Sequence, residues 1–209
     1  MMIKFSITQL ETARRNPVVF ARNLSSKNSL GGFSYSRFAA WQNAIFYWHK
    51  TDDQSQARDY LSNAMQKFLS VLRSGHQLAQ YVHKFDSYIR SHKDLGFSFV
   101  EARKRISLPI NEDVTLTGQI PIINLNGKLG YSIIFFVKEG TGWDGQLKFP
   151  LLQSFFANTI FGCELSEIEV GIFSFDKERH FSKTYNEEEV DTCLKEIYEI
   201  GRKIRKTLK

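Results

Sequence analysis

The chain has 209 residues, enough for one domain with a sizeable core. Hydrophobic residues make up 42% of it and only four residues are proline, a composition that excludes an intrinsically disordered protein. No apolar run reaches the roughly 18 residues that span a bilayer, and the first residues lack the apolar stretch of a secretory signal. We therefore expect a cytoplasmic protein without a membrane partner.

Basic residues outnumber acidic ones, and the net charge of +6 is compatible with a nucleic-acid partner. Basic residues are densest at 103–105 and 202–209, and a run of acids at 187–191 precedes the second of these segments. Because acids favour the start of a helix and bases its end, the second segment is partly a helix-dipole effect. Two cysteines, Cys163 and Cys193, are too few for a four-cysteine metal site, and we expect reduced thiols.

The first half of the chain has helical periodicity. The spacing of Thr8 and Glu11 is that of a capping box and predicts a helix that begins near Thr8. Asn16-Pro17 ends this helix and can start another. Apolar residues three and four positions apart then predict three longer helices, over about 35–49, 54–72 and 78–89. We expect the histidines near the last of these helices to be exposed: His76, His83 and His92.

After Gly96 the pattern changes to strands. Runs of β-branched and apolar residues predict strands at 104–110, 114–125, 131–137 and 168–175. An Asn126-Gly127 turn joins the second and third of these strands. Helical periodicity returns at 147–161 and from residue 186 onward. The order predicts one α/β domain over 1–209, with a mixed sheet flanked by helices: a helical part at 1–95 and a β-β-β-α-β-α core at 96–209.

Four stretches resemble motifs of the PD-(D/E)XK nuclease superfamily, in particular its RecB-like branch. Residues 5–24, FSITQLETARRNPVVFARNL, resemble the opening segment of those enzymes. Residues 116–126, LTGQIPIINLN, are similar to its Gly-x-Ile-Asp-x-Ile strand, and residues 131–138, YSIIFFVK, to its Tyr-x-Ile-x-Asp-x-Lys strand. Residues 146–162 resemble the following helix, whose glutamine faces the active site. The resemblance implies a restriction-endonuclease-like core.

The same resemblance implies that the catalytic site is not intact. In the family, two acids hold one or two magnesium ions, and a lysine orients the attacking water. Matched position by position, the acids fall on Pro121 and Phe136, and only the lysine, Lys138, is retained. Neither replacement offers the oxygen ligands that Mg²⁺ requires. We therefore expect a nuclease-like protein without a metal site, a cofactor or catalytic activity.

Such a protein would bind nucleic acid, either DNA or RNA, as a subunit of a larger prokaryotic or phage assembly in DNA repair, replication or antiviral defence. Phosphate contacts from the basic side chains would be independent of sequence and sensitive to salt. Trp143 is a candidate for stacking on a base, and Gln146 competes with Gln153 for the role of the helix glutamine. The expected contacts are Arg103, Lys104, Arg105, Lys138, Trp143, Lys148 and Gln153.

Two alternatives remain open from the sequence. In the first, the protein is an active nuclease that binds Mg²⁺ or Mn²⁺ through relocated acids, with Glu139 or Asp144 acting beside Lys138; Glu112 and Asp113 are further candidates. His49 falls where family members place an active-site His or Glu, although a surface or capping role also fits it. In the second alternative, the protein is a structural component that binds only other proteins, through exposed aromatic residues.

Overall fold

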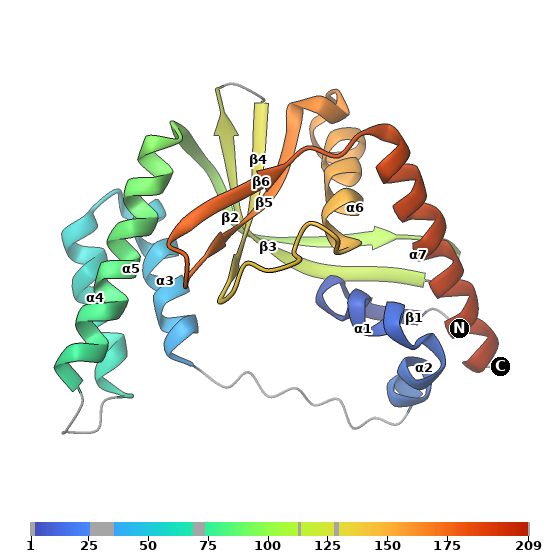
Figure 1. The fold of residues 1–209 in the computed structure, drawn as a ribbon, viewed down its shortest axis with the longest axis horizontal. Helices are drawn as coiled ribbons and strands as arrows, with labels where there is room; N and C mark the ends of the chain where they lie inside the picture. The colour runs from blue at the N-terminus through green and yellow to red at the C-terminus, as the bar shows by residue number, and fades with distance from the viewer. Residues whose placement is uncertain (1–2, 26–35, 69–73, 113, 128–129, 209) are drawn as a thin grey trace.

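The computed structural model describes residues 3–25, 36–68, 74–112, 114–127 and 130–208. Within these ranges the chain forms a six-stranded mixed sheet with helices on both faces (Figure 1). The expected α/β class and the flanked mixed sheet are therefore confirmed. None of the helices in the described part of the chain is both long enough and apolar enough to cross a membrane.

The sheet is built around its longest central strand. The strands are β1 (Ile3–Ser6), β2 (Phe97–Pro109), β3 (Val114–Asn126), β4 (Gly130–Val137), β5 (Ile168–Ser174) and β6 (Arg179–Lys183). β3 pairs with antiparallel β2 along one side, and with parallel β1 and antiparallel β4 along the other. β5 continues the sheet parallel to β4, and antiparallel β6 follows. β1 and β6 were not predicted from the sequence, so the first 95 residues are not wholly helical.

The described part of the chain also has seven α-helices, two short 3₁₀ helices at Ile7–Gln9 and Leu165–Glu167, and a π-helical turn that extends α6 at Phe156–Phe161. The α-helices are α1 (Leu10–Arg15), α2 (Pro17–Ser25), α3 (Arg37–Thr51), α4 (Gln54–Gln66), α5 (Ser74–Asp94), α6 (Lys148–Phe155) and α7 (Glu187–Leu208). The side chains of Ser36 and Asp53 cap α3 and α4. A helix does begin near Thr8, as a short 3₁₀ helix from Ile7 followed by α1, but its capping box consists of Ser6 and Gln9 and not of Thr8 and Glu11.

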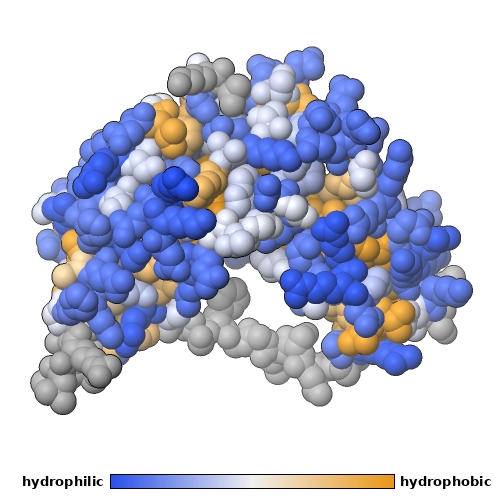
Figure 2. Space-filling view, viewed as in Figure 1, coloured by the Kyte–Doolittle hydropathy of each residue, from blue (hydrophilic) through white to orange (hydrophobic). Residues whose placement is uncertain are grey.

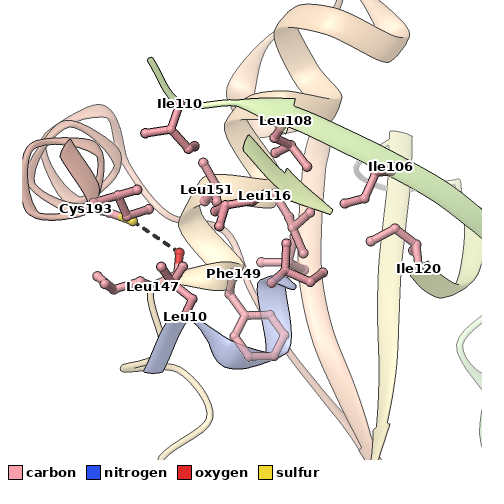
Figure 3. Close-up of a cluster of buried hydrophobic side chains, with 14 of the residues drawn as sticks. Leu10, Ile106, Leu108, Ile110, Leu116, Ile120, Leu147, Phe149, Leu151 and Cys193 are labelled. Carbon is pink, nitrogen blue, oxygen red and sulfur yellow. Dashed lines mark hydrogen bonds between the residues drawn. The ribbon is translucent and has the colours of Figure 1, made fainter. Parts of the chain in front are cut away.

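Two hydrophobic clusters cover opposite faces of the sheet. The first packs α1, α2, α6 and α7 against one face, and Figure 3 shows part of it, including Leu116 of β3 and Leu151 of α6. There Cys193 is buried, its thiol donates to the Leu147 carbonyl, and burial raises its pKa to about 12. The second cluster packs α3, α4 and α5 against the other face. The molecule therefore has three layers, and its N-terminal helices are divided between the two outer ones.

Candidate nucleic-acid interface

β2 and β3 change direction together at Arg103 and Pro121. The ladder pairs Ala102 with Ile122 and Lys104 with Ile120, but it skips the pair between them. Proline has no N–H to donate, and Arg103 has a left-handed φ of 58° that non-glycine residues seldom adopt. Ile120 and Ile122 consequently lie in different hydrophobic clusters, on opposite faces of the sheet. We call this point the bend; Figure 1 shows that β2 and β3 both change direction along their length.

The side chain of Arg103 is exposed at the bend but held in one orientation. Its guanidinium lies 4.3 Å from the centre of the Phe46 ring on α3. One of its nitrogens donates to Asn43 Oδ1, also on α3. Gln119 of β3 donates from Nε2 to the Arg103 carbonyl at 3.2 Å, which fixes the backbone. A cation that is already oriented loses less conformational freedom when it binds an anion.

Phe136 is the residue that the motif resemblance matches to the second acid. It is 8% exposed, and its ring centre lies 5.4 Å from that of Trp41, 5.6 Å from that of Tyr88 and 5.9 Å from that of Phe46. Because Phe46 also contacts the Arg103 guanidinium, one aromatic ring separates that cation from Phe136. The position is therefore occupied by aromatic packing, with a fixed arginine next to it.

Lys138 follows the last residue of β4, and its side chain is exposed. Its carbonyl accepts a hydrogen bond of 2.9 Å from the Asp176 amide, which anchors the backbone at this point. On β2, Lys104 forms an ion pair of 2.7 Å with Glu101, whereas Arg105 is exposed. Four of the expected basic contacts thus lie on β2 or at the end of β4.

The other three expected contacts belong to the face of the sheet that α6 covers. Trp143 is only 8% exposed and packs edge-on against Phe149, so it is not a free stacking platform. Lys148 Nζ lies 4.8 Å above the rings of Phe135 and Phe149, and burial lowers its pKa. The structure therefore does not bring all seven expected residues into one cleft.

Gln153 is fully buried and does not face an open cleft as expected. Its Nε2 donates to the carbonyls of Leu165 and Tyr185 at 2.9 and 3.0 Å, and its Oε1 accepts from the Tyr185 amide at 2.7 Å. These three bonds tie α6 to the segments before β5 and after β6. The role of Gln153 in this structure is to satisfy buried backbone groups.

The relocated acids of the active-nuclease alternative are spread over the surface. Glu139, Asp144 and Glu112 are exposed, and Asp113 lies outside the described residues. Among the residues that the structure describes, no group of three or more His, Cys, Asp or Glu side chains could hold a metal ion.

A partly buried histidine cluster lies between α3, α5 and the sheet, and the sequence analysis did not predict it. His49 Nε2 lies 2.8 Å from the Tyr88 hydroxyl, His92 Nε2 lies 3.1 Å from Asn124 Oδ1, and His180 Nδ1 lies 2.7 Å from Ser91 Oγ. Burial lowers all three pKa values, that of His49 to about 2 and that of His180 to about 3. The expectation that His92 is exposed was wrong, because it is 4% exposed.

No family model matches the chain, and no curated protein matches it in sequence.

Proposed function

We propose that this chain is a catalytically inactive protein of the RecB-like nuclease fold that binds nucleic acid as a subunit of a larger assembly. One observation carries the proposal. The oriented guanidinium of Arg103 lies at the bend, one ring away from Phe136, where the nuclease family has a metal-binding acid. Lys138 adds a second exposed cation just beyond β4.

The order and direction of the elements support the fold assignment. β2, β3 and β4 are antiparallel in succession, α6 follows, and β5 is parallel to β4. This is the β-β-β-α-β order that the motif resemblance implies. Because a fold can host many functions, the functional part of the proposal depends on Arg103 at the bend and on Lys138 beyond the end of β4.

The chemistry of these cations fits a phosphate backbone. A guanidinium can donate two parallel hydrogen bonds to one phosphate, whereas the lysine ammonium acts as a point charge. Contacts to phosphates carry no information about the bases, so binding would be independent of sequence and weakened by salt. The proposed role is to hold a nucleic-acid strand at the bend without cutting it.

A purely protein-binding role is the second candidate, favoured by exposed apolar side chains near the start of β2. Leu95, Phe99 and Val100 are 46%, 38% and 42% exposed, and Leu125 on the paired strand β3 is 45% exposed. Exposed apolar residues are typical of protein contacts; here Phe99 lies on the α3 side of the sheet, where its ring stacks on His49, and Leu125 lies on the other side. Sedimentation of the protein and of Phe99→Ser/Leu125→Ser tests this role, because a self-associating surface would lose association in the variant.

The test of the first proposal is a salt titration of nucleic-acid binding. Fluorescence anisotropy of labelled single- and double-stranded DNA and RNA would compare the native protein with Arg103→Gln/Lys138→Gln. We expect the variant to bind more weakly and to lower the slope of log affinity against log salt by about 2, one for each lost phosphate contact.

Lys50→Gln/Lys93→Gln is the matched control, because it removes two exposed charges from α3 and α5. It should leave the slope close to that of the native protein. Equal effects of the two double variants would contradict a site at the bend. No binding of any nucleic acid by the native protein would contradict the proposed function itself.

A further inference from the structure

The positive charge of the molecule is concentrated at the end that holds both termini (Figure 1). Residues 3–25, which form β1, α1 and α2, contain four basic residues and one acid. Residues 199–208, the last turns of α7, also contain four basic residues and one acid. Together these two segments carry +6, which equals the net charge of the whole chain. The two segments are adjacent in space, because α2 packs against α7.

We call the exposed basic side chains of these segments the terminal basic surface. It consists of Lys4, Arg15, Arg22, Arg202, Lys203, Arg205 and Lys206. Arg14 does not belong to it, because its guanidinium forms two hydrogen bonds with the Glu196 carboxylate, at 2.7 and 2.9 Å. Blue, hydrophilic atoms dominate this end in Figure 2, next to an orange patch over α2.

The basic residues of α7 face directly away from the core. At about 100° per residue, positions 202, 203, 205 and 206 cover an arc of roughly 160°. The buried positions Ile197, Ile200, Gly201 and Ile204 lie on the opposite side of the helix. The arc is therefore a continuous outward stripe of cations.

These charges have few internal partners. Arg202 forms an ion pair of 2.6 Å with Glu199, in the preceding turn of α7. Lys4, Arg15, Arg22, Lys203 and Lys206 form no ion pair with any residue that the structure describes. Like charges gathered in this way repel one another, and a polyanion would relieve that repulsion.

The helix dipole explains only part of the pattern. Arg15, Arg22, Arg205 and Lys206 lie in the last turns of their helices, where cations are favourable. However, Lys4 lies on a strand, and Arg202 and Lys203 precede the last turn of α7. A requirement for helix stability would not place these additional cations on the same end of the molecule.

We infer that the terminal basic surface binds the sugar–phosphate backbone of nucleic acid, as a second contact separate from the bend. This inference rests on the proposed function and adds a second surface to it. A surface groove of about 440 Å³ beside α7 has Arg202 and Arg205 on its wall, together with the acids Glu112 and Glu199. Because Glu199 both pairs with Arg202 and repels phosphate, its removal should strengthen binding.

The test compares two triple variants of the full chain by anisotropy with labelled DNA and RNA across salt concentrations. Arg202→Gln/Lys203→Gln/Lys206→Gln removes three charges from the surface. Lys50→Gln/Lys67→Gln/Lys93→Gln removes three exposed charges from the α3–α5 layer and is the matched control. We expect the first triple to weaken binding about ten-fold or more and to lower the salt slope by roughly 2 to 3, with little change in the control. Glu199→Gln should bind more tightly than the native protein.

Equal effects of the two triple variants, or an unchanged or lower affinity of Glu199→Gln, would overturn the inference. Tighter binding to phosphatidylserine vesicles than to nucleic acid would also overturn it, and this comparison matters because Val18 and Val19 on α2 are 41% and 47% exposed. Circular dichroism establishes that each variant is folded. If Arg103→Gln/Lys138→Gln weakens binding and the α7 triple does not, the inference fails while the proposed function stands; a native protein that binds no nucleic acid refutes both.

Discussion

At the scale of single residues, Phe136 matters most for catalysis, because its side chain has no atom that could bind a metal ion. Its ring is enclosed by those of Trp41, Phe46 and Tyr88. A carboxylate in its place would be buried away from water among three aromatic rings, where its charged form is costly. We expect Phe136→Asp to lower the free energy of unfolding by about 3 kcal/mol or more, measured by urea denaturation.

Phe136→Leu is the control, since it keeps an apolar side chain and should cost clearly less, about 1 to 2 kcal/mol. Two results would refute this account of the position. One is an equal loss in both variants. The other is a rise in the melting temperature of Phe136→Asp on addition of Mg²⁺, which would mean that a single restored acid rebuilds a metal site.

The structural positions of some of these residues could be predicted from the sequence, and those of others could not. Phe136 and Lys138 could be placed because a long apolar run that ends in a lysine defines β4 and its last residues. Gln153 could not, since its partners are backbone groups of Leu165 and Tyr185, which only the folded chain brings to α6. The left-handed Arg103 was equally hidden, although Pro121, which has no N–H to donate, could have indicated an irregular ladder.

At the scale of elements, the partly buried histidines between α3, α5 and the sheet make the free energy of unfolding depend on pH. His49 and His180 have pKa values of about 2 and about 3, against 6.5 for a free histidine, so both are neutral in the folded protein. In the unfolded chain they bind protons below about pH 6.5. The unfolded state therefore holds more protons, and the free energy of unfolding should fall as the pH falls below 6.5.

His180→Gln tests this coupling, because an amide replaces a titrating ring. The measurement is urea denaturation between pH 5 and 6.5, above the range where carboxylates titrate. The slope of the free energy of unfolding against pH should be smaller in the variant than in the native protein, by up to about 1.4 kcal/mol per pH unit. The exposed His76 provides the control: His76→Gln should leave the slope unchanged. If His180→Gln kept the pH slope of the native protein, His180 could not be neutral in the folded state.

The long elements were predictable and the short ones were not. α3, β3, β4 and α7 have strong apolar periodicity, and their boundaries agree with the prediction to within a few residues. β1 has only four residues, and β6 is a polar strand with two exposed positions, so neither gives a clear pattern. Missing β6 also meant missing His180. His92, in contrast, continues the buried stripe of Phe85 and Tyr88 on α5 and could have been recognised.

At the scale of the whole molecule, the main result is how charge and packing are distributed. The net charge of +6 was evident from composition, but its location was not. The location of this charge depends on contacts between β1 and β3 and between α2 and α7, which are far apart in the sequence. The bend and the terminal basic surface are thus products of the tertiary fold.

A cleavage assay on the native protein tests most directly whether the protein binds nucleic acid without cutting it. Labelled single- and double-stranded DNA and RNA would be incubated with Mg²⁺, Mn²⁺ or EDTA, and both retardation and cleavage recorded across salt concentrations. We expect salt-sensitive retardation that does not require a metal ion, and no cleavage. Metal-dependent cleavage that Lys138→Ala abolishes would contradict this expectation and would require a metal site built from other acids.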